Sequence, residues 1–270
     1  MLLSWQSGLA FERPPAGQVT GWGSTFISRV ERGTGITNIA SGWTHSLAIT
    51  SRGTVACWGD NFNDYGYAIL PEGLSNVVAV GGGQYHSVAL RSDGTVVVWG
   101  ANNDGQLMVP NGLSNVVAIS VGAFDCLALK ADGTVAAWGY SPDSTPPSGL
   151  SNVVAVAAGG FHSLALLGDG TVTGWGVSTY GEATLPNGVS HVVAIAAGLN
   201  HSIALKADGT VVTWGDNSRG QTNTPPGLSN VVAIAAGPYH SLALKQDGTV
   251  VSWGLNSAGQ TNVPSCRLGR

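Results

Sequence analysis

Charged side chains are scarce in this sequence of 270 residues. Asp, Glu, Lys and Arg together make up 10% of the chain, against about 25% in ordinary soluble domains. The net charge of −4 disfavours binding to nucleic-acid phosphates, which depends on clustered Lys and Arg. No apolar run reaches the length of about 18 residues that a transmembrane helix needs. We therefore expect neither nucleic acid nor a membrane among the partners of this protein.

Cysteine is nearly absent as well. Cys57, Cys126 and Cys266 are too few and too scattered for a disulfide framework or a zinc knuckle. Residues 1–5 have neither the basic start nor the long apolar stretch of a signal peptide. The sequence thus predicts no signal peptide at this start, and it leaves the cellular compartment open.

Glycine, by contrast, is abundant, with 40 residues beside a hydrophobic content of 43%. This hydrophobic content is high enough for a buried core. The dipeptide Trp-Gly recurs at intervals of 36 to 41 residues, at Trp22, Trp58, Trp99, Trp138, Trp175, Trp214 and Trp253. A period near 40 residues with a Gly/aromatic motif in every unit is typical of a propeller or a solenoid.

The last repeat shows what one unit contains. Residues 231–236, 241–245 and 249–253 are short, largely apolar runs, which we name strands A, B and C. Residues 260–263 form a weaker strand D, which ends at a proline. Between strands B and C, Asp247-Gly248 predicts a tight hairpin in which both residues have positive φ. Each sheet has a bulky and a small side, so successive sheets can stack face to face, and we predict an all-β fold.

Two sequence blocks recur with the repeats: Trp-Gly-x-Asn-x-x-Gly-Gln-Thr-x-x-Pro and Ala-Ala-Gly-x-x-His-Ser-Leu-Ala-Leu. They resemble the repeats of the regulator of chromosome condensation family, and more closely those of its bacterial members, which include a propeller-type beta-lactamase inhibitory protein. The resemblance implies a seven-bladed β-propeller of four-stranded antiparallel blades, forming one domain over residues 1–270. A degenerate first blade would occupy about residues 1–35, six fuller repeats about 36–264, and a short tail 265–270. An extracellular or periplasmic location would also fit the resemblance.

The repeats differ most in the turn between strands A and B. In an antiparallel meander this turn lies at the same end of the blade as the C–D loop, which also varies in length. Five of the six full repeats carry an aromatic residue in the A–B turn, although aromatics are only 7% of the chain. A constant scaffold with a variable aromatic rim is typical of a binding surface. The predicted binding residues are Trp43, Tyr85, Phe124, Asp125, Phe161, Asn200 and Tyr239.

The resemblance supports this prediction, because aromatic residues of the corresponding turns in the propeller-type inhibitor press against the captured enzyme. Asn200 departs from the aromatic pattern, so its sector of the ring should be more polar. The alternative is purely structural: these rings would plug the mouth of a central channel.

Histidine begins strand B in five repeats, at His45, His86, His162, His201 and His240. Metal ligands must converge within about 2 Å of one ion, whereas equivalent positions on separate blades are spread around a ring. A side chain that nearly every blade carries is better explained by a hydrogen bond to the backbone or to the next blade. We therefore predict no metal site and no cofactor, and we interpret the aspartates of the Asp-Gly-Thr turns as scaffold.

Four acidic residues fall outside the repeat pattern: Asp64, Asp125, Asp143 and Glu182. Asp125 replaces the histidine of its repeat, and Cys126 beside it is interpreted as a buried stand-in for serine. Two carboxylates about 5–10 Å apart would suffice for glycoside hydrolysis, so a carbohydrate-active propeller, either a glycan binder or a glycoside hydrolase, is the alternative. The favoured hypothesis is a non-catalytic module, a monomer that binds a protein partner with its aromatic loop surface.

Overall fold

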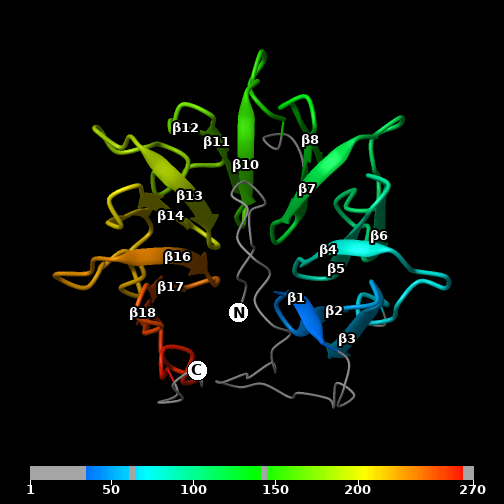
Figure 1. Cartoon of the computed structure of the whole chain (residues 1–270), viewed down its shortest axis with the longest axis horizontal. Helices are drawn as coiled ribbons and strands as arrows, with labels where there is room; N and C mark the ends of the chain where they lie inside the picture. The colour runs from blue at the N-terminus through cyan, green and yellow to red at the C-terminus, as the bar shows by residue number, and fades with distance from the viewer. Residues whose placement is uncertain (1–34, 61–64, 141–144, 264–270) are drawn as a thin grey trace.

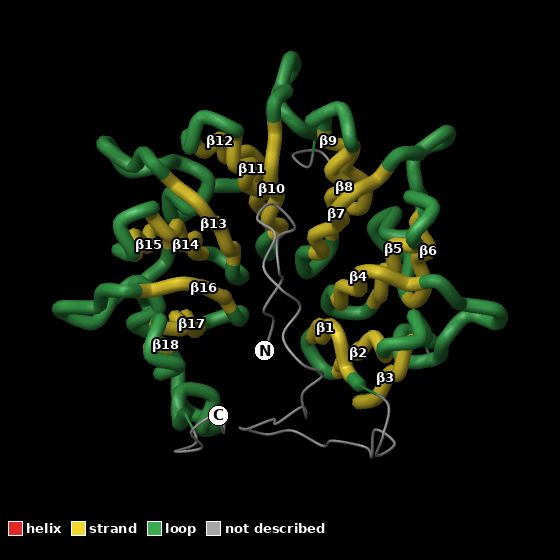
Figure 2. Tube along the Cα trace, in the orientation of Figure 1, coloured by secondary structure: helices red, strands yellow, loops and turns green. Residues whose placement is uncertain are grey.

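The computed structural model describes residues 35–60, 65–140 and 145–263. These residues form 18 β-strands arranged in six blades around a central axis (Figure 1). Each blade is a sheet of three antiparallel strands in chain order, and Figure 2 shows the loops that join them. Among these residues no helix is long and apolar enough to cross a membrane.

The strands have the same order in every blade, and the blades are numbered 1 to 6 along the chain. Strand A is β1 (Ile36–Ser41), β4 (Val77–Gly82), β7 (Val116–Val121), β10 (Val153–Ala158), β13 (Val192–Ala197) or β16 (Val231–Ala236). Strand B is β2 (His45–Thr50), β5 (His86–Arg91), β8 (Asp125–Lys130), β11 (His162–Leu167), β14 (His201–Lys206) or β17 (His240–Lys245). Strand C is β3 (Val55–Gly59), β6 (Val96–Gly100), β9 (Val135–Gly139), β12 (Val172–Gly176), β15 (Val211–Gly215) or β18 (Val250–Gly254).

The predicted four strands per blade are wrong, because the segment after strand C turns instead of pairing. In blade 2, Met108 N donates to Gly105 O (2.9 Å) and Leu107 N donates to Asn102 Oδ1 (2.9 Å). These bonds occupy backbone donors that a fourth strand would need for its ladder. The C–D loop is therefore a pair of turns that follows strand C, and the blade has three strands.

The predicted seven blades are also corrected, to six. The count of seven depended on a degenerate first unit around Trp22, and residues 1–34 lie outside the described part of the chain, as does the predicted tail 265–270. Six A–B–C units remain, and in Figure 1 a sector of the ring separates blade 6 from blade 1.

The turn between strands B and C differs in detail from the expectation. In blade 3, Gly133 has a φ of 77°, but Asp132 is not among the residues with positive φ. Gly133 N donates to Lys130 O (3.0 Å) and Lys130 N to Thr134 O (2.9 Å), which is a three-residue loop with glycine at the left-handed position. Asp132 Oδ1 accepts bonds from Thr134 N (3.0 Å) and Thr134 Oγ1 (2.6 Å). This confirms that the repeated aspartate is scaffold.

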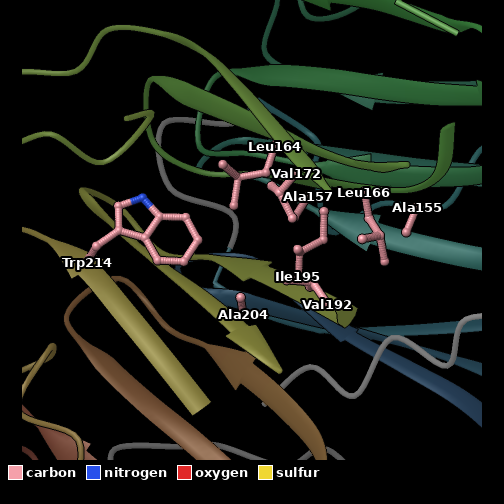
Figure 3. Packing of buried hydrophobic residues seen from close by; sticks show 9 residues of the cluster. All are labelled: Ala155, Ala157, Leu164, Leu166, Val172, Val192, Ile195, Ala204 and Trp214. Atoms are coloured by element: carbon pink, nitrogen blue, oxygen red, sulfur yellow. The ribbon is translucent and has the colours of Figure 1, made fainter. Parts of the chain in front are cut away.

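The hydrophobic core lies between neighbouring blades. Leu164 and Leu166 of β11 pack in one cluster with Ala204 and Trp214 of blade 5 (Figure 3). Equivalent clusters join blades 1 and 2, 2 and 3, 3 and 4, and 5 and 6. The bulky side of one strand B thus faces the small side of the next, as predicted. Burying one such leucine contributes about 1.5–3 kcal/mol.

Each of blades 2 to 6 enters strand A through a residue in the left-handed region. Four are the asparagines of the repeated Leu-Ser-Asn sequence, and one is a histidine. Their φ angles lie between 55° and 57°. The five residues are Asn76, Asn115, Asn152, His191 and Asn230. Asparagine tolerates this conformation better than most residues because its short side chain can hydrogen-bond locally. The repeated asparagine is therefore a requirement of the backbone.

Replacing Asn115 tests this requirement. Asn115→Ala should lower the free energy of unfolding by about 1 kcal/mol, because an alanine Cβ is strained at this φ. Asn115→Gly should stay closer to the wild type, since glycine has no Cβ. Urea unfolding followed by circular dichroism measures both, and equal losses in the two variants would contradict the explanation.

Candidate functional site

The A–B turn and the C–D loop of each blade meet at the same end of the strands, as predicted. Tyr140, the first residue after strand C in blade 3, donates its N–H to Phe124 O (3.0 Å). In blade 4, Val177 N donates in the same way to Phe161 O (2.9 Å). The other four blades repeat this bond. We call this end of the blades the loop end.

Backbone hydrogen bonds also join successive A–B turns around the axis. Trp43 N donates to Gly83 O (3.2 Å), Gln84 N to Ala123 O (2.9 Å), and Ala123 N to Gly159 O (3.0 Å). Corresponding bonds link the turns of blades 4 to 6. The turns line a cavity of about 90 Å³ that is open to solvent and walled mainly by glycine, alanine and other small residues.

At two seams, a backbone carbonyl of one blade accepts hydrogen bonds from two side chains of the next blade. At the seam between blades 4 and 5, the carbonyl oxygen of Glu182 accepts bonds from Trp214 Nε1 and Ser202 Oγ, both at 2.8 Å. His162 Nε2 lies 2.8 Å from Ser202 Oγ. Because the serine proton goes to the carbonyl, the histidine is the donor in this bond.

The contact between histidine and serine recurs at the seams between blades 1 and 2 and between blades 5 and 6. His45 contacts Ser87 (2.8 Å) and His201 contacts Ser241 (3.0 Å). This confirms the interpretation of the repeated histidine as a link between blades. The preceding glycine of the repeat is explained too, since a Cβ on Gly198 would clash with the ring of His201.

Burial keeps these histidines neutral. It lowers the pKa of His45, His86, His201 and His240 from 6.5 to about 4, and that of His162 to about 3. A neutral ring has one N–H, and the bond to serine places it on Nε2.

The predicted binding residues occupy two different positions at the loop end. Trp43 takes the first position of its A–B turn and lines the central cavity, with 45% of its surface exposed. Tyr85, Phe124, Phe161, Asn200 and Tyr239 take the second position, directly before strand B, and do not line that cavity. Most of the predicted rings therefore lie outside the channel wall.

Two clusters of aromatic rings lie at seams of the loop end. In the first, Tyr85 of blade 2 contacts Tyr65 and Tyr67 of the preceding C–D loop, with ring centroids 5.6 and 6.0 Å apart. In the second, Phe124 of blade 3 stacks on Phe161 of blade 4 at 5.0 Å and 25°.

Tyr140 completes the second cluster, with its ring centroid 5.7 Å from that of Phe161 and 6.3 Å from that of Phe124. Tyr140 is 41% exposed and Phe161 37%. We call Phe124, Tyr140 and Phe161 the aromatic triad.

The sequence prediction missed Tyr65, Tyr67 and Tyr140. All three stand in C–D loops or directly after strand C, which the irregular loop lengths had already assigned to the same end as the A–B turns. The signal that could have identified them is an aromatic residue in a C–D loop of irregular length.

Asp125 takes the histidine position in blade 3 and is 5% exposed. Its Oδ2 accepts a bond from Ser163 Oγ of blade 4 (3.3 Å), while its Oδ1 has no hydrogen-bond partner within the described structure. Burial raises the pKa of this carboxyl to about 7. Cys126 Sγ lies 3.2 Å from His86 Nε2, so the cysteine stands in for serine as predicted, and burial raises the pKa of its thiol well above the usual range.

The other predicted acids have different surroundings. Glu182 is 1% exposed, and its Oε2 accepts the N–H of Tyr180 (2.7 Å). Gln221 Oε1 makes the equivalent bond with Arg219 N (2.8 Å), so the Glu182 carboxylate holds a turn of the repeat. Asp64 and Asp143 lie outside the described residues. Asp125 and Glu182 as catalytic acids stay a prediction.

The repeats match the family model described as the regulator of chromosome condensation (RCC1) repeat at residues 36–66, 77–106, 153–182, 192–221 and 231–260. Together these five segments make up more than half of the chain. The chain belongs to the RCC1 repeat family. The matched segments of this RCC1-repeat propeller leave out blade 3, which carries Asp125 and Cys126. A search among curated proteins gave no match.

Solved structures share the fold of this RCC1-repeat propeller. Prp20p from Saccharomyces cerevisiae, described together with its binding properties to Gsp1p and histones, is 23% identical over 86% of this chain and 75% of that chain, with a TM-score of 0.73. Yeast RCC1 (Prp20) bound to Kap60 is 22% identical over 86% and 73%, with a TM-score of 0.70. Human WBSCR16 is 23% identical over 87% and 80%, with a TM-score of 0.70. Such identities support a common fold.

Removing the shared serine should destabilise the RCC1-repeat propeller. Ser202→Ala leaves the Nε2–H of His162 without its acceptor and removes one of two donors to Glu182 O. We expect a loss of about 1–3 kcal/mol in the free energy of unfolding, measured with urea. The exposed Ser257→Ala is the control and should change it by less than about 0.5 kcal/mol. Equal effects in the two variants would refute the role of the shared carbonyl.

The neutral histidines predict sensitivity to acid. Their folded-state pKa values are below the unfolded value, so their stabilising contribution is full above pH 6.5 and is lost as the pH falls through about 4. On going from pH 7.5 to 5.5, each of these histidines should lower the free energy of unfolding by roughly 1 kcal/mol. Urea unfolding at both pH values measures this, and His162→Gln, which keeps an N–H donor, should lose less than the wild type. Equal slopes in the two proteins would argue against this cause.

Proposed function

We propose that this protein is a non-catalytic binding propeller that holds a protein partner at its loop end. The observation that carries the proposal is the aromatic triad, whose rings gather exposed apolar surface from two blades at one seam. Phe161 and Tyr140 are each more than one-third exposed, and they contact each other edge to face. Buried aromatic anchors commonly supply most of the binding energy of a protein interface.

The scaffold behind the triad supports this function. Phe124 and Phe161 each directly precede a strand B whose first residue is locked into a seam between blades. Their carbonyl groups are also held by the first residue after strand C of their own blade. Rings fixed in this way lose little conformational entropy on binding, which favours affinity.

Charge distribution favours a protein over a nucleic acid as the partner. Of the cationic side chains in the described ranges, Arg52, Arg91, Lys130, Lys206 and Lys245 lie at the opposite end, at the B–C turns, and Arg219 lies in a C–D loop. Three of the lysines pair with neighbouring aspartates. A phosphate backbone needs several cations at its binding surface, and the loop end offers aromatic rings in their place.

Relatives with this fold also bind proteins. Prp20p was described with its binding to Gsp1p and histones, and yeast RCC1 (Prp20) was solved with Kap60. The resemblance of the A–B turns to those of the propeller-type inhibitory protein points to the same end of the blades. The glycoside-hydrolase alternative requires two accessible carboxylates, whereas Asp125 and Glu182, the two candidates among the described residues, are buried and have separate partners. We therefore place a protein partner first.

Substitutions in the triad test the proposal. The wild type and Val154→Ala, a control at an exposed residue of strand A, should capture the same partner from cells of the source organism. Phe161→Ala and Tyr140→Ala should each weaken its binding by at least about tenfold, as truncation of an interface anchor does. Titration calorimetry on the purified partner gives the dissociation constants. Unchanged affinity in both triad variants would refute the loop end as the binding surface, and turnover of chromogenic glycosides by the wild type would favour the alternative.

A further inference from the structure

The seam between blades 3 and 4 differs from the others in its hydrogen bond. The seam between blades 4 and 5 joins the blades through the neutral imidazole of His162 and a serine at 2.8 Å. Between blades 3 and 4 a carboxyl group replaces the imidazole, and the bond from Ser163 Oγ to Asp125 Oδ2 is 3.3 Å long. The repeated contact is thus made by a group that can acquire a negative charge.

The surroundings of Asp125 Oδ1 disfavour that charge. This oxygen is buried without a hydrogen-bond partner within the described structure. A Cβ added to Gly122 would meet both Asp125 Oδ1 and the carbonyl oxygen of Gly159, so the two oxygens border the same small volume. A carboxylate oxygen beside a carbonyl and without a donor is poorly solvated, whereas a protonated carboxyl is tolerated.

The titratable groups near Asp125 supply no compensating charge. Cys126 follows it on β8, His86 on β5 contacts that cysteine, and His162 on β11 precedes the bonded serine. Burial favours the neutral form of all three. The neighbouring strands β7, β9 and β10 contain no titratable residue.

The stacked pair of the aromatic triad lies directly before these two strands. Phe124 directly precedes Asp125 at the start of β8, and Phe161 lies two residues before Ser163 at the start of β11. The stacked rings and the Asp125–Ser163 bond therefore cross one seam within two residues of each other. A backbone shift that moves the start of β8 away from the start of β11 therefore separates the rings as well as the carboxyl and the serine.

We propose that Asp125 is a positioning residue whose proton holds Phe124 on Phe161, so that deprotonation opens this pair and alters the binding surface. This inference rests on the proposed function for its biological meaning, but the conformational change is a property of the chain alone. With its proton, the carboxyl stays in the seam and the triad is closed. Without it, the carboxylate moves toward water and draws the start of β8 away from β11.

The direction of the pH effect follows from burial. The pKa of Asp125 is raised from 3.8 to about 7, so the closed seam is favoured at pH 5.5 and is lost as the pH rises through 7. This direction is opposite to that of the histidines, which destabilise the fold when the pH falls. Between pH 5.5 and 8.5 the repeated histidines stay neutral in the folded state, because their pKa values are about 4 or lower.

Nuclear magnetic resonance on the full chain without a partner tests the proposal. The carboxyl carbon of Asp125 should titrate with a midpoint near pH 7. The nuclear Overhauser effect between the ring protons of Phe124 and Phe161 should fall several-fold from pH 5.5 to 8.5 with the same midpoint. This nuclear Overhauser effect should stay constant over the same pH range in Asp125→Asn and in Asp125→His. The second variant restores the residue that the other repeats carry.

The exposed Asp132→Asn is the matched control and should keep the wild-type profile. The proposal is overturned if the ring contact titrates unchanged in Asp125→Asn, or if it stays constant in the wild type while the carboxyl titrates. If the Asn variant does not fold, the wild type still decides, since different midpoints for the carboxyl and the rings overturn the coupling. A constant ring contact leaves the proposed function intact, and unchanged partner binding by Phe161→Ala, which would count against the proposed function, says nothing against the titration.

Discussion

Neighbouring blades depend on a carbonyl group that one blade presents and the next blade satisfies. In the C–D loops of blades 1 and 4, the carbonyl oxygens of Tyr67 and Glu182 each accept bonds from the tryptophan and the serine of the following blade. Histidine of the first blade donates to that serine, and a glycine leaves room for the imidazole ring. Four motif residues that are far apart in the sequence thus meet at one polar contact, and the leucine clusters surround it with apolar packing.

This contact determines where the protein can vary. The seams require fixed residues at the start of strand B and at the end of strand C, but they leave side chains of the A–B turn and of the residues that follow strand C free to vary. Tyr140 and Phe161 stand in these free positions, a residue or two from the fixed ones. The proposed binding surface is therefore held in place by the seams, although its own residues differ from blade to blade.

The sequence predicted those features that depend on residues within one repeat. The period, strands A to C, the shared end of the variable loops and the structural role of histidine follow from residues close together or from comparing repeats. Strand D was predicted wrongly because the segment after strand C forms turns. The Glu182 carbonyl in this segment also accepts bonds from Ser202 and Trp214, which lie 20 and 32 residues away. Tyr65 and Tyr140 were missed because their ring contacts cross from one loop to another.

The seam contact also gives the ring a direction. A blade offers its histidine and its loop carbonyl forward along the chain and receives serine and tryptophan from the blade that follows. During synthesis on the ribosome, the donor and the acceptor of the newest blade therefore stay exposed to water until roughly forty more residues emerge, the length of one repeat. Each blade is fully hydrogen-bonded only after the next blade has formed, so the last blade of a truncated chain is the least stable.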